Sequence, residues 1–587
     1  MKFTQNFEVV GGSLVLTAAV ALIPILFFFW ALAIKRMKGY IAGLSTLAIA
    51  LVVAILFYKM PAGLAVMSAS QGAVYGVLPI GWIIITSVFL YKITVKTGQF
   101  DIIRRSVLSI TEDRRLQALL VAFSFGAFLE GAAGFGAPVA ISAALLVGLG
   151  FNPLYAAGLC LMANTAPVAF GAIGIPIIAM EGPTGIPAME ISKMVGRQLP
   201  FLSVFIPFYL VLIMAGWKRT IEILPAIAVS GISFAVTQFL SSNYLGPELP
   251  DILSALVSLF ALAIFLKFWK PKTIFKFAAE QEMAAASAQK VSKNETTLTG
   301  GMVFKAWSPF LVLTAVISLW GTPAIKMALN GTYVGTNGFL VALTKIGHAL
   351  TFKPEVPFLN QAGEVLDPVT KEMIPGIVSV ISNAAGIPGA INVYKLEVLA
   401  AAGTAILISA IITKFITGIS WKGFVETFFE TLNEIKYPII TIAAVVGYAY
   451  VTNSSGMSTA MGLTLAKTGS LFPFFSPLLG WLGVFITGSD TSANVLFGGL
   501  QKTTALEVGM NPILALSANA SGGVTGKMIS PQSIAVACAA VGLAGRESDL
   551  FRFTLKHSLF LVLLICILTA VQHYFFSGMI PVYIPTK

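Results

Sequence analysis

The sequence predicts an all-α, polytopic membrane protein with about 12 transmembrane helices and two re-entrant hairpins. Of its 587 residues, 57% are hydrophobic and only 11% are charged, so no soluble domain of useful size remains. Gly, Pro and Asn residues recur in the same order in both halves of the chain, which indicates an internal repeat. Apolar runs near the roughly 20 residues that a helix needs to cross a bilayer recur throughout; examples are 13–34, 40–58, 201–217, 252–268 and 398–416.

The first of these runs, 13–34, is predicted to be a retained span rather than a signal peptide. It is too long for the apolar region of a signal peptide, lacks a small-x-small cleavage site and ends in Lys35-Arg36. Basic residues follow it and gather again at 92–115, after the third span, which places both loops in the cytoplasm. We therefore expect the N-terminus outside the cell and, after an even number of spans, the C-terminus outside as well.

The charges and the cysteines argue against several classes of protein. The net charge is +12, but the lysines and arginines lie in short loops between spans, so we expect no nucleic-acid partner. The sequence contains no HExxH, GxSxG or Cys/His cluster that would indicate an enzyme. A channel would need a continuous stripe of polar residues. The cysteines stand singly in apolar stretches and predict packed thiols, with no metal and no cofactor: Cys160, Cys538 and Cys566.

A shift of about 357 residues aligns the two halves of the chain. We divide the chain into a first half (1–270), a cytoplasmic linker (271–304) and a second half (305–587) that contains a long external loop, 321–394. The ordered matches include two Asn positions and one Asn-Pro pair, which chance alone seldom supplies: Gly43 with Gly403, Pro79 with Pro438, Gly131 with Gly488, Asn152-Pro153 with Asn511-Pro512, and Asn164 with Asn519.

The charges of the loops indicate that one half is inverted relative to the other. The basic loop 92–115 corresponds to 452–470, which holds only Lys467, whereas the weakly charged loop 181–197 corresponds to 542–556, where basic residues accumulate. An inverted-topology repeat is typical of secondary transporters, which hold their substrate near the membrane midplane between the halves.

Each half contains one predicted re-entrant hairpin with a carboxylate at its tip. Only about 34 apolar residues separate two cytoplasmic loops around EGAAGFGAP (130–138), too few for two spans and a turn. The matching segment, 471–505, has its own polar tip, GSDTSAN (488–494). The tips place Glu130 and Asp490 at membrane depth.

After each predicted hairpin comes an apolar helix whose middle contains residues that disfavour a helix. The first holds ANTAP (163–167) with Pro176 beyond it, and the second holds SANASGG (517–523) with Lys527 and Pro531. Pro and Gly break helices, and the freed amides persist at membrane depth only if they line a polar cavity. Helix N-termini aimed at one point then make an anion site. The predicted substrate-binding residues are Gly131, Gly134, Gly136, Asn164, Thr165, Ser489, Thr491, Ser492, Asn494, Asn519, Ser521 and Lys527.

These residues also resemble a known family. The runs GAFLEGAAGFGAPVAISAALLVGLGFNPLYAAGLCLMANTAPVAFGAIGIP (126–176), TGSDTSANVLFGGLQ (487–501) and SANASGGVTGKMISPQSIAVACAAVGLAGRESDL (517–550) are similar to the L-lactate permease family, which includes glycolate permeases. The resemblance implies proton-coupled symport of L-lactate, D-lactate or glycolate across the bacterial inner (cytoplasmic) membrane. It also suggests an elevator-type transporter, in which a transport domain slides past a scaffold, and it leaves open whether the protein is a homodimer.

Two alternatives remain at this point. Lys527 would attract the substrate carboxylate while Glu130 or Asp490 takes up the coupled proton, but Asp490 and Lys527 could instead pair to hold the second half together, because a charge at mid-bilayer costs about 2.5–3.5 kcal/mol. The freed carbonyls and the Asn and Ser oxygens could also hold sodium, which would give a sodium-coupled symporter of another small carboxylate. The carboxylates at both tips favour protons.

Overall fold

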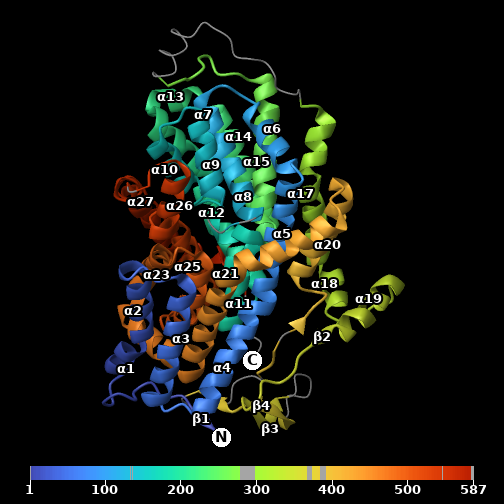
Figure 1. Ribbon diagram of the computed structural model, residues 1–587. Coiled ribbons are helices and arrows are strands. Elements are labelled where there is room, and N and C mark those ends of the chain that lie inside the picture. Colours follow the sequence, from blue (N-terminus) through green and yellow to red (C-terminus); the bar gives the residue numbers. More distant parts are fainter. Residues whose placement is uncertain are drawn as a thin grey trace.

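Helices account for most of the chain in the computed structural model, as the apolar runs predict (Figure 1). The structure describes residues 2–132, 134, 137–277, 298–366, 373–383, 392–394, 396–544 and 546–582. Within these residues, 11 helices are long and apolar enough to span a membrane, or up to 12 if a bent pair is one span. These counts agree with the expected number of crossings.

The first half consists of helices alone, apart from one short strand at the start of the chain. Its elements are β1 (Phe3–Thr4), α1 (Leu14–Ala21), α2 (Ile23–Phe29), η1 (Trp30–Ile34), α3 (Gly39–Leu56), α4 (Ala62–Tyr75), η2 (Gly76–Gly81), α5 (Trp82–Lys96), α6 (Gln99–Leu108), α7 (Arg114–Gln117), η3 (Ala118–Phe125), α8 (Gly126–Ala132), α9 (Ala137–Gly148), α10 (Pro153–Ala163), η4 (Val168–Phe170), α11 (Gly171–Thr184), α12 (Ala188–Ala215), α13 (Trp217–Glu222), α14 (Leu224–Tyr244) and α15 (Pro250–Phe268).

The second half begins inside the predicted linker, since α17 starts at Gly300. Its elements are α17 (Gly300–Gly321), α18 (Pro323–Leu329), α19 (Gly338–Ala349), β2 (Thr351–Phe352), β3 (Asn360–Leu366), β4 (Met373–Ser379), β5 (Ile381–Ser382), β6 (Leu396–Glu397), α20 (Ala402–Thr417), α21 (Trp421–Ser455), α22 (Met457–Leu465), η5 (Ala466–Leu471), α23 (Phe472–Thr487), α24 (Asp490–Glu507), α25 (Pro512–Lys527), α26 (Pro531–Ala540), α27 (Glu547–Tyr574) and η6 (Ser577–Met579).

The described strands form three small two-stranded sheets, all at or near the predicted external loop. The pairs β2–β6 and β3–β4 are antiparallel. The parallel pair β1–β5 aligns Phe3 with Ile381 and so ties the start of the chain to the second half. In Figure 1 both chain ends lie at this end of the molecule, and the described residues that flank the linker lie at the opposite end.

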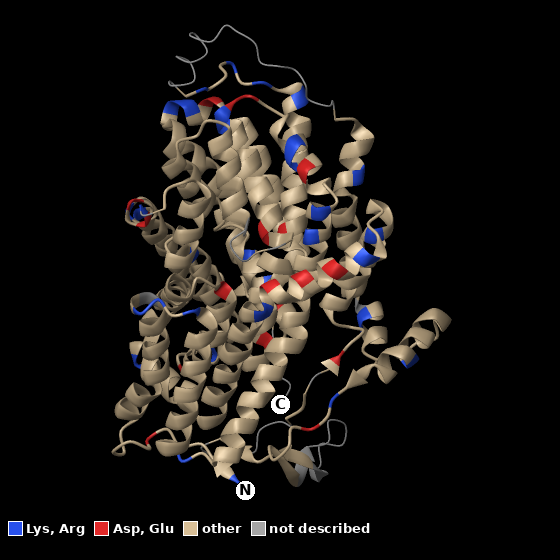
Figure 2. Ribbon diagram, in the orientation of Figure 1, with Lys and Arg blue, Asp and Glu red and all other residues tan. Residues whose placement is uncertain are grey.

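Basic side chains gather at the end that carries the linker. Figure 2 shows Lys and Arg around α6, α7 and α13 there, with isolated charges in the middle of the molecule. Arg115 is fully buried at this end; it donates hydrogen bonds to Asp113 (2.8 Å), to Glu222 (2.9 Å) and to the carbonyl of Thr273 (2.8 Å). The bond from Arg115 lowers the pKa of Glu222 below its ordinary value. This cluster fixes the start of the first hairpin against α13 and the segment after α15.

The entering arm of the first hairpin runs through α7, η3 and α8 and is enclosed by protein. Its most apolar window, within Arg114–Ala132, is 100% buried, whereas that of α3 is 33% buried. A lipid-facing span would leave one side exposed, so the arm lies inside the helix bundle. In the tip of this hairpin, Gly134 has a φ of +58°, whereas Gly136 lies outside the described residues. In the second hairpin, α23 ends at Thr487 with Gly488 (φ +69°) as its C-cap, and α24 begins at Asp490.

The first predicted broken helix is present, and the second is interrupted just before Pro531 rather than within its glycine-rich stretch. The axes of α10 and α11 differ by 63°, and Ala172 and Ile173 adopt positive φ values (45° and 58°), which non-glycine residues rarely do. By contrast, α25 continues without a break through SANASGG to Lys527, so the predicted break at 517–523 is wrong. The chain interrupts the helix only at 528–530, before α26.

The reason for this difference is the packing of α25 against α23. A Cβ placed on Gly522 would lie 2.0 Å from the carbonyl oxygen of Pro477, and one on Gly526 would lie 2.3 Å from that of Trp481. The glycines therefore allow two helix backbones to approach each other closely, as small residues do in membrane helix pairs. A glycine-rich stretch in a sequence predicts a break and a close approach equally well.

Candidate functional site

A buried ion pair joins the two halves at the first hairpin. The ammonium Nζ of Lys527, the last residue of α25, donates a hydrogen bond to Oε1 of Glu130 in α8 at 2.9 Å. The side chains are 13% and 3% exposed. Charges at membrane depth need partners, and these two residues, 397 apart in the sequence, supply them to each other. The structure thus brings together two of the charges that the sequence singled out.

Glycines allow close packing around Glu130 and beside it. A Cβ at Gly171, the first residue of α11, would lie 2.7 Å from Oε1 of Glu130. A Cβ at Gly131 would lie 2.8 Å from the Cβ of Asp251. The carboxylate of Glu130 is therefore packed against the start of α11, and the backbone of α8 at Gly131 lies against the first turn of α15.

Asp251 is a functional candidate that the sequence did not single out. It is 1% exposed, both of its carboxylate oxygens lack a hydrogen-bond partner, and it interacts electrostatically with Glu130 and Lys527. Because it directly precedes the predicted apolar run 252–268, it appeared to be the polar start of a span at the membrane surface. An acidic residue at the head of an apolar run, directly after Pro250, is the signal that could have drawn attention to it.

Asp490, at the start of α24, belongs to a chain of amide side chains. Its Oδ2 accepts a hydrogen bond from Nδ2 of Asn494 (3.1 Å), and Oδ1 of Asn494 accepts one from Nδ2 of Asn519 (2.9 Å). Asp490 interacts electrostatically with Lys527 and Glu130. The interpretation in which Asp490 forms the ion pair with Lys527 is wrong, because Lys527 makes its ion pair with Glu130.

The second hairpin also contacts the broken helix of the first half. Nδ2 of Asn494 donates a hydrogen bond to the carbonyl of Pro176 in α11 (3.2 Å), and the amide of Gln501 donates to Oδ1 of Asn519 (3.1 Å). This hydrogen bond joins the first turns of α24 to the backbone of α11. The two predicted Asn positions of the second half therefore lie side by side in one network.

The other predicted residues fall into three groups. Asn164 and Thr165, at the break after α10, are buried, and Nδ2 of Asn164 and Oγ1 of Thr165 have no partner. Ser489 caps α24 by accepting a hydrogen bond from the amide of Ser492, beside the partly exposed Thr491. Ser521 donates instead to Oε1 of Gln198 in α12 (2.8 Å), so its hydroxyl is engaged in a helix contact.

The charges of this site do not balance. Glu130 pairs with the ammonium of Lys527, and two more buried carboxyl groups, those of Asp251 and Asp490, interact with it electrostatically; each of the three carries at least one oxygen without a hydrogen-bond partner. Burying an unpaired charge is costly, so such a set can take up protons and can exchange partners around the ammonium. No group of three His, Cys, Asp or Glu within the described ranges is arranged to hold a metal ion.

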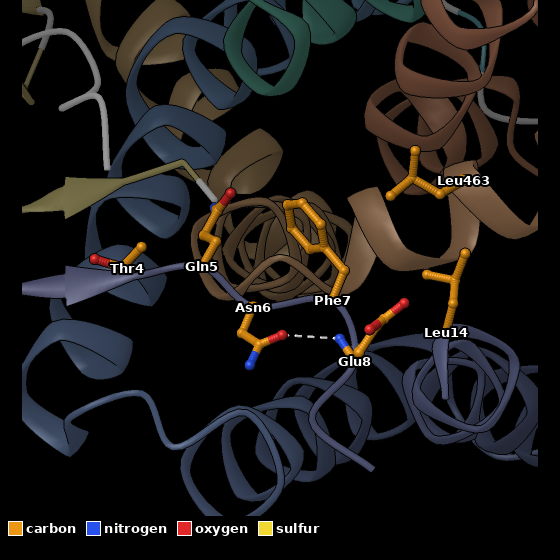
Figure 3. A pocket seen from close by; sticks show the side chains of 7 residues that line it. All are labelled: Thr4, Gln5, Asn6, Phe7, Glu8, Leu14 and Leu463. Carbon is orange, nitrogen blue, oxygen red and sulfur yellow. Dashed lines mark hydrogen bonds between the residues drawn. The ribbon is translucent and has the colours of Figure 1, made fainter. Parts of the chain in front are cut away.

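A separate hollow at the start of the chain lacks these features. It has a volume of ≈ 510 Å³ and is lined by residues from the N-terminal segment and α22 (Figure 3). One carboxylate, Glu8, lies in it without a basic residue in its lining, and the amide of Glu8 donates to Asn6. We place the functional site at Lys527 rather than here.

The sequence is closely similar to known permeases. The family model for L-lactate permease matches residues 17–576. An L-lactate permease of Bacillus subtilis is 70% identical over 99% of this chain and 100% of its own. The glycolate permease GlcA of Escherichia coli is 52% identical over 99% of this chain and 100% of its own, and an L-lactate permease of Escherichia coli is 51% identical over 98% and 99%.

A solved structure, that of the Alcanivorax borkumensis YdaH transporter, aligns with 95% of this chain at 13% identity with a TM-score of 0.45, a similarity too low to support conclusions about mechanism. The sequence comparisons extend over nearly the whole length of both proteins in each pair. This chain, with its many apolar helices, belongs to the L-lactate permease family.

Proposed function

We propose that this protein is a secondary active transporter that takes up L-lactate, D-lactate or glycolate together with protons across the bacterial cytoplasmic membrane. The relatives named as L-lactate permeases and as a glycolate permease support this choice of substrate, since both acids are small 2-hydroxy monocarboxylates. The observation that carries the mechanism is the buried ion pair between Lys527 and Glu130.

In this mechanism the substrate carboxylate competes with Glu130 for Lys527. An ammonium donates three hydrogen bonds and attracts any nearby carboxylate. When the substrate takes this position, Glu130 loses its cation in a buried setting and binds a proton, since an unpaired buried carboxylate is costly. The substrate and the proton then enter the site together, which is what symport requires.

Asp490 is the second proposed proton-coupling residue. It interacts electrostatically with Lys527 from α24, and its free Oδ1 can accept a proton while Asn494 holds Oδ2. The unpartnered amide of Asn164 and hydroxyl of Thr165 are suited to a 2-hydroxy acid, because one can donate to the carboxylate and the other can bond to the hydroxyl. We propose that the two hairpins with α10, α11 and α25 form a transport domain that moves past a scaffold containing α3, α4 and α21.

The test is uptake of labelled L-lactate into proteoliposomes under an imposed pH gradient, with and without sodium. We expect uptake driven by inward protons without sodium, competition by D-lactate and glycolate, and loss of uptake in Lys527→Ala. Lys422→Ala is the matched control, because the side chain of Lys422 is 87% exposed. If Glu130→Gln or Asp490→Asn still exchanges lactate for lactate but no longer accumulates it, the carboxylate that was replaced couples proton movement to lactate transport.

The competing function is sodium-coupled symport of another small carboxylate. A strict requirement for sodium, or the absence of lactate uptake by the parent protein, would refute the proposal of a lactate and proton symporter. The amide and carbonyl oxygens around Asn494 and Asn519 would then be the first residues to examine as sodium ligands.

A further inference from the structure

We propose that Asp251 is an additional proton-binding site of the transporter, which takes up a proton when a substrate carboxylate binds Lys527. The inference rests on the proposed function and extends it to a residue outside the hairpins. Its basis is the packing of Asp251 against Gly131, next to the Glu130 that pairs with Lys527, and the two oxygens of Asp251, which are buried without hydrogen-bond partners.

Asp251 has no structural task that would explain its burial. It lies in the first turn of α15, but the N-cap of this helix is Leu249 and no side chain caps it. The two oxygens of Asp251 accept no hydrogen bond, whereas a carboxylate at a helix start usually accepts from backbone amides. A carboxyl group that is buried at a cost and fixes nothing else is a candidate for proton binding.

The surrounding charges make the protonation of Asp251 depend on Lys527. The charged groups that interact with it are Glu130 from α8 and Lys527 from α25, while Asp490 from α24 interacts with the same ammonium. Glu248, in the turn before α15, interacts electrostatically with Lys326 and Glu181. Within the site, Lys527 is therefore the cation that favours an ionised Asp251, and Glu130 opposes it.

When substrate binds, Lys527 no longer favours the ionised form of Asp251. Once the substrate carboxylate has taken Lys527, the ammonium is neutralised by a new anion, and Asp251 and Glu130 are left as two adjacent carboxyl groups without a cation of their own. Two like charges this close do not both stay ionised, so protons from water bind the pair. No covalent bond other than O–H forms, and the proton leaves when the substrate departs and Lys527 is free again.

Packing keeps Asp251 next to Glu130 during this exchange. Residue 131 has no side chain, and a Cβ there would lie 2.8 Å from the Cβ of Asp251 and 3.0 Å from the backbone nitrogen of Ile252. The first turn of α15 thus lies directly against the backbone of α8. The hairpin carboxylate and Asp251 form one unit that faces Lys527.

The experiment is calorimetric titration of the purified protein with L-lactate in two buffers of different ionisation enthalpy, which gives the number of protons taken up per lactate bound. We expect Asp251→Asn to bind lactate, to take up fewer protons than the parent by about one half or more, and to show a flatter dependence of affinity on pH, because Asn imitates a permanently protonated Asp. Asp251→Glu should restore proton uptake.

Ser254→Ala is the matched control, because Ser254 lies one turn later on α15 and is equally buried without a partner. An unchanged proton count and pH profile in Asp251→Asn would overturn the inference while leaving the transport proposal intact. Loss of lactate binding in both Asp251→Asn and Asp251→Glu would assign Asp251 a structural role and overturn it as well. A parent protein that binds no lactate would instead refute the proposed function.

Discussion

The carboxylate of Glu130 has room beside Lys527 only because residue 171 is a glycine. The backbone of Gly171 has a φ of −61°, which any residue adopts, so the need for glycine comes from the space and not from the backbone. A Cβ there would lie 2.7 Å from Oε1 of Glu130, closer than two unbonded heavy atoms normally approach. The ion pair therefore depends on a residue that carries no charge.

We expect Gly171→Ala to push the Glu130 carboxylate away from Lys527. The displaced Glu130 carboxylate then competes less strongly with lactate for the ammonium of Lys527. Lactate binding at alkaline pH should therefore tighten roughly three- to tenfold, or ~1 kcal/mol, while proton-driven accumulation declines. Titration with lactate and uptake under a pH gradient measure the two effects. The control is Gly148→Ala, since nothing lies within 4 Å of a Cβ at Gly148; weaker lactate binding in Gly171→Ala would contradict the competition between Glu130 and substrate.

The charged residues of the site were partly predictable for a simple physical reason. A charge inside an apolar run is costly unless it is used, so Glu130, Asp490 and Lys527 stand out in the sequence. Their pairing could not be predicted, because it depends on which helices meet in space. Asp251 escaped notice because the sequence around it has the appearance of a loop and a helix start, and only the tertiary contacts bury it.

Among the elements, the helix pair α23–α25 shows how far sequence reasoning extends. The bend between α10 and α11 was predicted from prolines, which act locally, and the structure confirms it, whereas the re-entrant course of the two hairpins stays a prediction from run lengths. The glycines of α25 were interpreted as a break, although they serve contact with α23. A helix break and a close packing contact use the same residue type, so the distinction needs the partner helix.

This packing predicts that Gly522→Ala destabilises the pair. The added Cβ would lie 2.0 Å from the carbonyl oxygen of Pro477, and the helices must separate to accommodate it, at a cost of about 1–3 kcal/mol. Thermal unfolding in detergent should show a lower transition temperature and, because Asp490 contacts the next residue, weaker transport. Gly63→Ala, where a Cβ meets nothing within 4 Å, should leave unfolding unchanged or slightly raise its temperature; equal behaviour of the two variants would argue that α23 and α25 are not tightly packed.

At the scale of the whole molecule, the two halves interlock rather than stand side by side. Asn453 of α21 donates a hydrogen bond to the carbonyl of Pro183 in α11 (2.7 Å), and a Cβ at Gly499 of α24 would lie 2.3 Å from its Oδ1. This asparagine therefore lies where the proposed scaffold meets the proposed transport domain. By contrast, the contact of Gly43 with Ala444 lies within the scaffold, with a Cβ at residue 43 at 3.3 Å from that of Ala444.

These two contacts allow a direct test of the elevator mechanism. In a background without Cys160, Cys538 and Cys566, oxidation of Asn453→Cys/Gly499→Cys should join α21 to α24 and abolish lactate uptake, and reduction should restore it, because a domain that is covalently fixed to the scaffold cannot slide past it. The pair Gly43→Cys/Ala444→Cys should form a disulfide without loss of uptake, and the single variant Asn453→Cys should lose no activity on oxidation. Full transport by a completely cross-linked 453–499 pair would mean that α24 keeps its place beside α21 throughout the cycle, so that access alternates through local movement of the hairpin tips.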